Sequence, residues 1–372
     1  MLLPPRYISK LSLTCFRCYS KVSLKVESAN VVLTGSNGAG KTNLIEAVSL
    51  ISPGRGLRGV PFDNLAQINA TQPWAVAIVA QTPNGPIKIG TGANPEKSGR
   101  RVRIDGANAT AIEDMAAHVR MLWLTPAMDG LFTGPAGDRR RFLDRLVMTL
   151  IPDHSRSVVA YEKAMRQRNR LLEDNADPDW ISAVEVQMAD FAAAMHFARA
   201  DSLAHLQQLA STDVSRAFPA SGLALDPIFA NNNQTFASSS ALEQALLAHW
   251  RDTRHLDRAA KRTLVGPHRV DLQVTHLQKS MPAKLCSTGE QKALLIGLIL
   301  AHARLVSNMT GITPILLLDE VAAHLDPNRR IALFEALGAL NTQVWMTGTD
   351  PILFDGLADG AQHVRVEEGE LS

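Results

Sequence analysis

The 372-residue sequence predicts an α/β fold in which a parallel-sheet core is interrupted by a mainly helical lobe. Three observations support this fold class. A glycine-rich phosphate-binding motif follows a short β-branched run, an apolar strand ending in two acids lies far downstream, and helical periodicity dominates the stretch between them. The expected parts are residues 1–136, the N-terminal part of the ATPase; residues 137–263, the inserted helical lobe; and residues 264–372, the C-terminal part of the ATPase.

The N-terminal part is expected to contain antiparallel strands. Residues 7–16 and 21–26 predict two strands that lead into a third. Further strands are expected on either side of the turn at residues 82–86, over residues 74–80, 87–90 and 101–104. A helix over residues 112–118 and a strand over residues 119–124 follow. The pattern therefore predicts an antiparallel β subdomain in this half of the ATPase.

Residues 35–42, with the sequence GSNGAGKT, match the P-loop spacing G-x-x-x-x-G-K-[ST]. A buried strand over residues 31–33 is predicted before the motif and a helix over residues 43–50 after it, which is the context that a P-loop requires. Glycines let backbone N–H groups surround phosphate oxygens, and the helix directs its positive end at the same anion. Lys41 is expected on the β- and γ-phosphates and the Thr42 hydroxyl on Mg²⁺. The predicted nucleotide-binding residues of this loop are Gly35, Ser36, Asn37, Gly38, Ala39, Gly40, Lys41, Thr42 and Asn43.

The inserted lobe is predicted to be built from long helices. Helical periodicity runs over residues 139–150, 156–174, 178–210 and 239–264, with a non-helical piece at residues 222–233. The lobe carries no sustained heptad pattern of apolar residues, so no long coiled-coil arm is expected.

The C-terminal part returns to alternating helices and strands. A helix over residues 289–305, a strand over 315–318, a helix from residue 328 and a strand over 344–346 are expected. The strand at 315–318 ends in Asp319 and Glu320. In a chain that also has a P-loop, this is the Walker B arrangement, in which Asp319 holds Mg²⁺ and Glu320 polarises the attacking water.

Residues 285–292, LCSTGEQK, open the helix that precedes this strand. Ser287 is a predicted N-cap with Glu290 three residues later, so the segment can simply be a well-capped helix. The Ser287 hydroxyl, the Gly289 amide and the helix N-terminus also make a second anion site. One chain cannot easily bring both anion sites onto one triphosphate, whereas two chains facing head to tail can.

The order of P-loop, S-x-G-x-Q signature and Walker B strand, followed by residues 323–326 (AHLD), resembles that of ABC ATPases. Within this class the chain resembles the SMC-like RecF family, and the matching segments span nearly the whole chain. These segments are residues 16–19 against F-R-N-Y, 37–47 against N-G-x-G-K-T-N-L-x-E-A, 52–58 against G-R-S-x-R, 139–144 against R-R-x-F-L-D, and 266–269 against G-P-H-R.

The resemblance implies an ABC-type, SMC-like P-loop ATPase head without a long coiled coil. It implies a DNA recombination-repair mediator that forms a homodimer on ATP, binds duplex DNA near single-strand gaps, works with RecR and assists RecA loading. ATP and Mg²⁺ would be its cofactors, and weak hydrolysis would reset the DNA-bound dimer. The resemblance further implies that Arg17 contributes to nucleotide binding and that the protein is cytoplasmic and nucleoid-associated.

The chain departs from the family pattern at three places. Ala127 stands where the family usually carries an acid, and Val270 replaces one acid after G-P-H-R. The strand after Walker B continues as residues 346–350, MTGTD, without the histidine of ABC transporters. A γ-phosphate sensor at that strand would have to be a threonine hydroxyl, and slow hydrolysis is expected.

The net charge is only +2, so nucleic-acid binding has to come from local patches. A single basic run is more often a solvated face, and the sequence leaves open which runs contact DNA. Without a zinc-finger, RRM or helix-turn-helix signature, recognition of the DNA backbone is expected. The basic runs are Arg100, Arg101 and Arg103; Arg139, Arg140, Arg141 and Arg145; Lys163, Arg166, Arg168 and Arg170; and Arg251, Arg254, Arg258, Lys261 and Arg262.

The cysteines and the apolar runs give little sign of a metal site, a redox pair or a membrane segment. Cys15 and Cys18 have C-x-x-C spacing, which a zinc half-site or a redox pair would share, but one pair without further ligands favours ordinary reduced thiols, as for Cys286. No apolar run reaches the roughly 18 residues of a membrane helix, and the first ten residues do not read as a signal peptide. A soluble protein without a membrane partner is expected.

Two other functions fit parts of the pattern. The nucleotide-binding subunit of a membrane transporter would carry a histidine on the strand after Walker B, which this chain lacks. The F-R-x-Y and G-P-H-R segments also argue against a transporter subunit. An ATP-gated nuclease component would carry an acidic metal domain after the ATPase, and little sequence follows Asp350.

Overall fold

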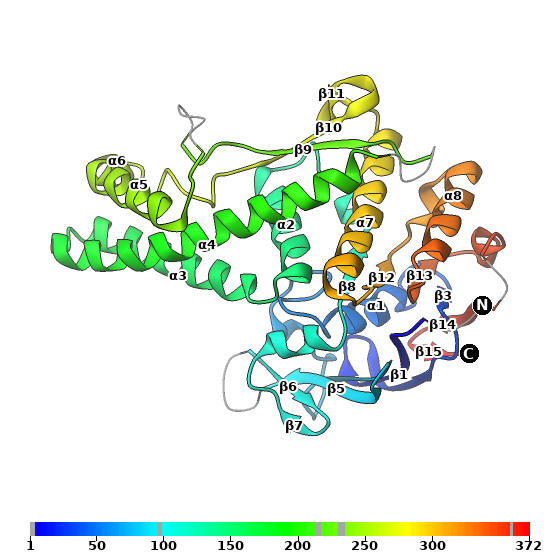
Figure 1. The fold of residues 1–372 in the computed structure, drawn as a ribbon. Coiled ribbons are helices and arrows are strands. Elements are labelled where there is room, and N and C mark those ends of the chain that lie inside the picture. The colour runs from blue at the N-terminus through cyan, green and yellow to red at the C-terminus, as the bar shows by residue number, and fades with distance from the viewer. Residues whose placement is uncertain (1–3, 95–98, 213–216, 230–234, 358–359) are drawn as a thin grey trace.

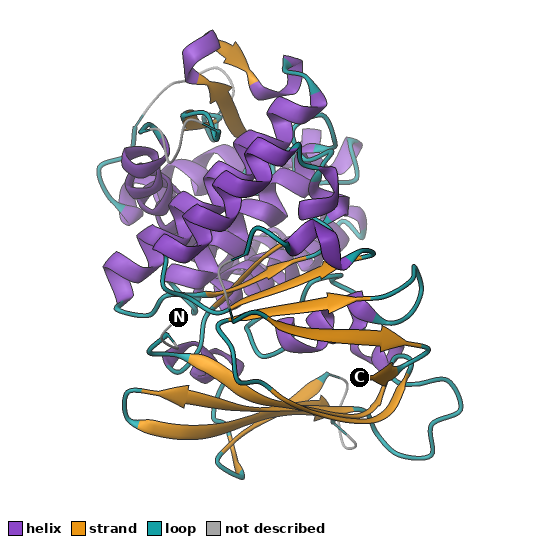
Figure 2. Cartoon of the chain, turned by 90° about the vertical axis from the view of Figure 1, so that its right-hand side faces the viewer, coloured by secondary structure: helices purple, strands orange, loops and turns teal. Residues whose placement is uncertain are grey.

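The fold was analysed in a computed structural model, which describes residues 4–94, 99–212, 217–229, 235–357 and 360–372. Two sheets occupy one end of the molecule and a group of long helices the other (Figure 1). Viewed from the side, most helices gather above the two sheets, and shorter helical segments lie among the strands (Figure 2). The arrangement confirms the α/β fold class.

The first sheet is the antiparallel β subdomain that the sequence predicts. Its six strands follow the order β2-β1-β4-β5-β6-β7, and every neighbouring pair is antiparallel. Its strands are β1 (Tyr7–Phe16), β2 (Tyr19–Lys25), β4 (Ala75–Thr82), β5 (Gly85–Ala93), β6 (Arg100–Ile104) and β7 (Ala107–Asn108).

The second sheet is the ATPase core, with the order β15-β14-β3-β13-β12-β8. All its pairs are parallel except β14 with β15. Parallel strands direct their carboxyl ends to one edge, so the segments that follow β3 and β12 meet there, with β13 between the two strands. Its strands are β3 (Asn30–Thr34), β8 (Met121–Leu124), β12 (Ile315–Leu318), β13 (Val344–Gly348), β14 (Gln362–Glu367) and β15 (Glu370–Leu371).

Side chains of this sheet alternate between two hydrophobic cores, as the period of a strand requires. Leu316 and Leu318 of β12 join the core around α7 (Thr288–Thr310), whereas Leu317 joins the core shared by α1 (Lys41–Ser49) and the antiparallel sheet. The four-residue apolar run of β12 is therefore buried on both faces, which explains why it lacks the polar alternation of an exposed strand.

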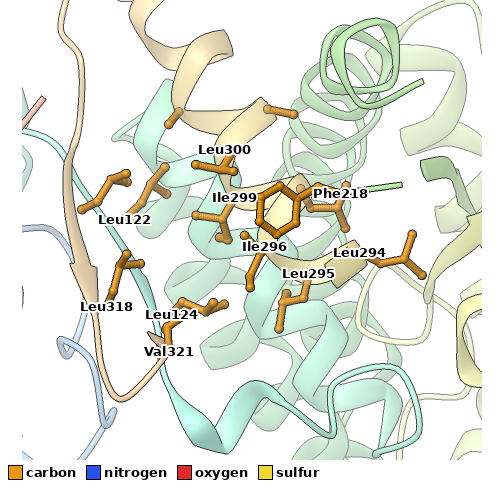
Figure 3. Packing of buried hydrophobic residues seen from close by; sticks show 14 of the residues in the cluster. Leu122, Leu124, Phe218, Leu294, Leu295, Ile296, Ile299, Leu300, Leu318 and Val321 are labelled. Carbon is orange, nitrogen blue, oxygen red and sulfur yellow. The ribbon is translucent and has the colours of Figure 1, made fainter. Parts of the chain in front are cut away.

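Helix α7 is the central element of the first core. Figure 3 shows side chains such as Ile296, Ile299 and Leu300 of α7 directed toward Leu122 and Leu318 of the sheet. Each fully buried side chain of this size contributes roughly 1.5–3 kcal/mol to folding. By length and composition alone α7 would suffice to cross a membrane, but 72% of its most apolar window is buried inside the protein. It is thus an internal helix of the ATPase.

The helical lobe packs α3 against α4 and α4 against α5. Within it, a small sheet pairs β9 with β10 and β10 with β11. Because β9 follows α4 and β10 lies beyond residue 264, this sheet crosses the expected boundary between the lobe and the C-terminal part. The elements are α2 (Ala136–Leu150), α3 (His154–Glu173), α4 (Pro178–Ala210), β9 (Ser221–Leu225), α5 (Ser239–Asp252), α6 (Arg254–Ala259), β10 (Leu272–His276) and β11 (Met281–Pro282).

Several expected elements differ from those observed. The single helix expected over residues 239–264 breaks at Thr253, which leaves helical geometry and donates its hydroxyl to the His249 carbonyl at 2.8 Å. The expected helix at residues 112–118 is a 3₁₀ helix, Ile112–Ala117, and the non-helical piece after α4 contains β9. The last described α-helix is α8 (Pro327–Ala339). The longest described helix is α4, with 33 residues, and the described lobe has no long coiled coil.

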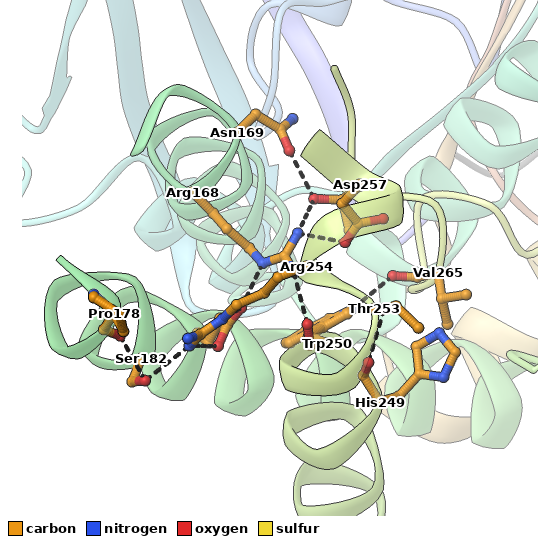
Figure 4. Close-up of polar contacts among 12 residues, drawn as sticks. Arg168, Asn169, Pro178, Ser182, His249, Trp250, Thr253, Arg254, Asp257 and Val265 are labelled. Atoms are coloured by element: carbon orange, nitrogen blue, oxygen red, sulfur yellow. Dashed lines mark hydrogen bonds and ion pairs between the residues drawn. The ribbon is translucent and has the colours of Figure 1, made fainter. Parts of the chain in front are cut away.

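A buried ion network joins the helices of the lobe (Figure 4). The fully buried guanidinium of Arg168 on α3 donates to Glu185 at 2.9 Å and to Asp257 at 2.7 Å. Arg254 donates to both carboxylate oxygens of the same Glu185, at 3.1 and 2.5 Å. Arg168 and Arg254 belong to the basic runs considered for DNA contacts, but these guanidinium groups are used inside the lobe.

We expect Arg168→Met to lower the free energy of unfolding by about 3–5 kcal/mol, because the change leaves Glu185 and Asp257 as buried charges with less compensation. Urea denaturation followed by circular dichroism measures this loss. Arg166→Met is the matched control, since Arg166 lies on the same helix, is exposed, and among the described residues pairs only with Glu162, at 3.6 Å. Equal stability of the two variants would contradict a structural role for the network.

Candidate nucleotide-binding site

The P-loop connects β3 to α1 and is held tightly by its neighbours. Gly35 has φ of +149°, and a Cβ there would lie 2.2 Å from the Val366 carbonyl oxygen. Gly40 has φ of +114°, and a Cβ there would lie 2.6 Å from the Tyr19 hydroxyl oxygen. A side chain at Gly35 would displace the backbone of β14, and one at Gly40 would displace the Tyr19 side chain, so both glycines are required by close packing as well as by torsion angle.

Lys41 is buried at the first position of α1. Its ammonium donates to the carbonyl oxygens of Gly35 at 2.7 Å and Ser36 at 2.8 Å, so it lies against the loop from which it emerges. Burial lowers the pKa of Lys41, and the negative charges of Glu320 and Asp319 oppose this shift. The P-loop lysine and both Walker B acids thus interact electrostatically in the folded chain.

The Thr42 hydroxyl donates to the Asp319 carboxylate at 3.0 Å, which joins two motifs 277 residues apart. Burial raises the pKa of Asp319, whereas the hydrogen bonds from Thr347 and Thr42 lower it. A hydroxyl and a carboxylate are the oxygen ligands that Mg²⁺ takes at phosphate-binding sites, together with water and phosphate oxygens. Thr42 and Asp319 therefore fit the metal role that the sequence assigns to them.

Thr347 has a role that the sequence did not reveal. Its hydroxyl donates to the same Asp319 oxygen at 2.7 Å and accepts the Glu320 backbone N–H at 2.9 Å. The sequence left a threonine hydroxyl of this strand as the possible γ-phosphate sensor. The Thr347 hydroxyl instead bonds to two groups of the Walker B segment. Thr349 is the exposed threonine of residues 346–350.

Glu320 adopts a left-handed backbone conformation, with φ of +53°. Such a conformation is uncommon for a residue other than glycine and is often found at functional sites. Its backbone N–H is held by Thr347, and the side chain is partly exposed beside Lys41. The geometry is compatible with the predicted role in polarising water, which stays a prediction.

Arg17 lies beside α1 and not within the P-loop. Its guanidinium makes a two-point contact with Glu46, at 2.9 and 2.7 Å, and donates to the Asn64 carbonyl at 2.8 Å. Arg58 pairs with the same Glu46 at 3.1 Å. Through these bonds Arg17 connects α1 to the segment around Asn64. Its contribution to nucleotide binding stays a prediction.

Two neighbours of Arg17 reach the P-loop directly, which the spacing of the F-R-x-Y segment alone did not indicate. The buried Tyr19 hydroxyl donates to the Gly40 carbonyl at 3.0 Å, and burial raises the Tyr19 pKa. The Cys18 thiol accepts a hydrogen bond from the Asn43 amide at 3.2 Å. Cys15, Cys18 and Cys286 are free cysteines.

The signature segment begins α7 at the end that lies beside β10 and β11, whereas α1 lies toward the opposite end of that helix (Figure 1). Ser287 and Glu290 form the predicted capping box, and the Gln291 amide donates to the Cys286 carbonyl at 2.8 Å. Arg329 of α8 donates to the Gly289 carbonyl at 3.1 Å. Ser287 and Gly289 are thus held at a rigid helix start, apart from the P-loop of their own chain.

Glu290 is the acidic member of this capping box. Hydrogen bonds from Lys279 and from Ser287 lower the pKa of Glu290 to about 2, so its carboxylate is ionised at neutral pH. The carboxylate thereby keeps the serine hydroxyl oriented at the start of the helix.

The R-R-x-F-L-D and G-P-H-R segments both make contacts inside the protein. Arg139 of α2 makes a two-point ion pair with Asp271, at distances between 2.6 and 3.1 Å. The Tyr161 hydroxyl lies 2.6 Å from His268 Nδ1, and burial lowers the pKa of His268 to about 4, so the ring is neutral at physiological pH. Val270 is buried in the apolar cluster of the lobe, which explains why an uncharged residue is accepted there.

The remaining basic residues fall into an internal and an exposed group. Arg100 is buried and donates to the carbonyls of Leu50 and Ser52, which excludes it from contact with DNA in this conformation. The exposed basic side chains of the predicted runs are Arg101, Arg103, Arg141, Lys163, Arg166, Arg170, Arg251, Arg258, Lys261 and Arg262.

Comparisons with known proteins agree with this geometry. The RecF/RecN/SMC N terminal domain family matches residues 7–368, so the fold and the joined P-loop and Walker B motifs define an SMC-like ABC ATPase head. The chain belongs within that class to the RecF family of DNA replication and repair proteins. It is 49% identical over 368 residues to the "DNA replication and repair protein RecF" of Rhizobium etli (strain CIAT 652), with 98% of each chain covered. The protein of the same name from Mesorhizobium japonicum is 49% identical over 373 residues, covering 98% of this chain and 97% of the relative.

Solved structures show the same fold. A structure described as the recombination mediator protein RecF-ATPrS has a TM-score of 0.87 at 21% identity and covers 100% of this chain and 98% of its own. A RecF-ATP structure has a TM-score of 0.82 at 22% identity, with 99% of both chains covered. An Smc head domain from Pyrococcus furiosus reaches 0.52 at 13% identity, covering 99% of this chain and 95% of its own.

We expect Thr347→Val to raise the Mg²⁺ concentration needed for half-maximal ATP binding by about 10- to 100-fold, because Asp319 loses the donor that orients it. Loss of this donor also raises the pKa of Asp319, so protons compete with Mg²⁺ more strongly as the pH falls. Titration with a fluorescent ATP analogue at several Mg²⁺ concentrations and pH values measures both effects. Thr349→Val, on the exposed threonine, is the control, and an identical Mg²⁺ midpoint for both variants would refute the assignment.

Proposed function

We propose that the protein is an ATP-dependent DNA-binding recombination-repair mediator. The observation that carries this proposal is the contact between Thr42 and Asp319, which joins a P-loop and a Walker B strand in a chain of the RecF family. Two structural relatives are described with ATP or ATPrS, which supports ATP as the nucleotide. In this proposal residues 1–136 and 264–372 form the ATPase head, and residues 137–263 form the lobe that it carries.

Each group of the nucleotide site has a distinct task in this proposal. Backbone groups of residues 35–40 surround the phosphates, and Lys41 neutralises the β- and γ-phosphate charge. Thr42 and Asp319 would hold Mg²⁺, which supplies further charge neutralisation when bound. Glu320 orients and polarises the attacking water, while Thr347 keeps Asp319 and the Glu320 backbone in place.

ATP would act mainly as an assembly ligand. Ser287 and Gly289 lie at the start of α7, away from the P-loop of their own chain, so they would contact a nucleotide held by a second copy. Two chains facing head to tail would then enclose two nucleotides, and slow hydrolysis would release the dimer. Arg17, held against α1 by Glu46, would support the nucleotide from the flank.

Duplex DNA near a single-strand gap would be the substrate, with contacts to the phosphate backbone. The exposed arginines and lysines of the β5–β6 hairpin and of the helical lobe supply the cations for such contacts. Cooperation with RecR and assistance in RecA loading are part of the same proposal, from membership of the family. The protein would accordingly act in the cytoplasm, associated with the nucleoid.

Binding to duplex, gapped and single-stranded DNA, with and without ATP, tests this function as a whole. A mediator of this kind should bind gapped or duplex DNA more tightly in the presence of ATP, with affinity falling as salt is raised. Affinity that does not depend on ATP would contradict the proposed ATP-dependent function, and no affinity for any of the three DNAs would favour the transporter-subunit alternative.

We expect Glu320→Gln to retain ATP binding and to slow hydrolysis by about 10²-fold or more, because the variant cannot accept a proton from water. The slowed variant should accumulate as an ATP-bound dimer, which analytical ultracentrifugation detects. Glu335→Gln, on the exposed face of α8, serves as the control. Hydrolysis by Glu320→Gln at the unmodified rate would place the catalytic base elsewhere.

We expect Ser287→Arg to abolish the ATP-dependent dimer while ATP still binds the monomer, because the arginine blocks the approach of a partner's phosphates. Ser238→Arg is the matched control. Ser238 caps α5 as Ser287 caps α7, so both changes should cost on the order of 1 kcal/mol of stability. Sedimentation with a slowly hydrolysed ATP analogue reports association, and a dimer of Ser287→Arg as tight as the control would refute the shared site.

Mixing Ser287→Arg chains with Lys41→Met chains extends this test. In a head-to-tail dimer each site takes its P-loop from one chain and its signature from the other. A mixed dimer then has one site with both parts intact and one with both parts damaged. Partial recovery of ATP hydrolysis on mixing is expected only for such shared sites.

A further inference from the structure

A cavity of about 520 Å³ lies outside the nucleotide site. It is bordered by the loop that follows α1 (residues 52–59), by the segment around β8, and by one side of α2 and α3. Its volume is within the range of pockets that bind small molecules or peptide segments. Ala127, at the position where the family usually carries an acid, also faces this cavity.

Arg145 of α2 lines the cavity without an anionic partner. Its guanidinium lies between two rings, 4.8 Å from the centre of the Trp123 ring and 5.3 Å from that of Phe142. Its described polar contact is weak, 3.4 Å to the Met128 sulfur, and its Nε atom is buried without an acceptor. No carboxylate of the described residues forms an ion pair with it.

Three other arginines inside this chain have the carboxylate partner that Arg145 lacks among the described residues. Arg139, Arg168 and Arg199 each donate to a carboxylate. Burial lowers the pKa of Arg145 to about 9, which means that its charge is destabilised by its surroundings. A charged group in such a position gains most from an anion that enters the cavity and accepts its hydrogen bonds.

The walls of the cavity select what can carry that anion. Met121, Met128 and Met148 give it flexible thioether surfaces that adapt to aliphatic or aromatic side chains. The cavity is also bordered by Arg58, Arg120 and Arg141 and by the acids Asp138, Asp144 and Glu162, whose negative charges limit how many anionic groups can enter. The lining therefore favours a single carboxylate attached to an apolar body over a nucleic-acid strand.

The exposed border of the cavity, which we call its mouth, carries a further cation. Arg55 lies in the loop after α1, is exposed, and has no ion-pair partner among the described residues. A bound segment therefore meets positive charge from the partly buried Arg145 and from the exposed Arg55, next to apolar walls. This charge pattern is complementary to a short acidic–hydrophobic peptide.

We propose that this cavity is a docking site for an acidic–hydrophobic peptide segment of a partner protein. One carboxylate of the segment accepts hydrogen bonds from Arg145, and a neighbouring apolar side chain packs against the methionines. The site is separate from the P-loop, so the proposal does not depend on the nucleotide chemistry proposed above.

The probe for this proposal is N-acetyl-Leu-Phe with a free carboxylate, compared with its carboxamide. Methyl NMR of labelled methionines reports binding, because three of the eleven methionines, Met121, Met128 and Met148, line the cavity. Their signals are assigned by Met→Leu substitution. The free acid should shift these three signals saturably, and the amide should bind at least tenfold more weakly.

Arg145→Met should weaken binding of the free acid at least tenfold, to the level of the amide. Arg103→Gln, on the exposed face of β6, is the control and should bind as the unmodified protein does. If Arg145→Met does not fold, Arg55→Glu replaces it, because this exposed change reverses the charge at the mouth without altering the core. A several-fold loss of affinity is expected for Arg55→Glu.

Four results would overturn the proposal. They are equal affinity for acid and amide, unchanged affinity of the substituted proteins, shifts confined to methionines outside the cavity, and no saturable binding up to about 10 mM, a concentration at which even weak binding would be detected. Displacement of the acid by a thymidine tetranucleotide of equal or higher affinity would also overturn it, in favour of a nucleic-acid site.

Discussion

One carboxylate oxygen of Asp319 holds the two halves of the nucleotide site together. It accepts a hydrogen bond from Thr42, after β3, and another from Thr347, on β13. The strand order β3-β13-β12 makes this possible, because it brings three carboxyl ends to adjacent positions of one parallel sheet. Without that order, the P-loop and the Walker B acids would be distant segments of a long chain, and the inserted lobe would separate them in space as it does in sequence.

The sequence predicted those parts of the structure that depend on residues close together in the chain. The P-loop, the strand before Asp319 and the boundaries of α4 follow from glycine spacing, apolar runs and helical periodicity. The helix break at Thr253 was missed, because a hydroxyl that bonds the preceding turn leaves no trace in apolar periodicity. The burial of Arg168 was missed for a related reason: its partners Glu185 and Asp257 come from other helices. The role of Thr347 and the cavity around Arg145 likewise depend on tertiary contacts.

The family segments divide into two kinds once their contacts are known. Residues 35–42 and Asp319 belong to the proposed nucleotide site, whereas the R-R-x-F-L-D and G-P-H-R segments connect α2, α3 and the strand that follows residue 271. Arg139 with Asp271, and Tyr161 with His268, are internal bonds of that connection. Position 270 does not need an acid, because Val270 packs into the apolar cluster of the lobe.

Glu46 occupies an unusual position in this arrangement, because one buried carboxylate on α1 receives guanidinium groups from two different segments. Arg17 reaches it from the antiparallel sheet and Arg58 from the loop that borders the cavity. Hydrogen bonds of this length tolerate only a few tenths of an ångström of stretching. A small displacement of α1 must therefore either carry both segments with it or break one of the two contacts, so the helix that follows the P-loop is mechanically linked to a sheet on one side and to the cavity wall on the other.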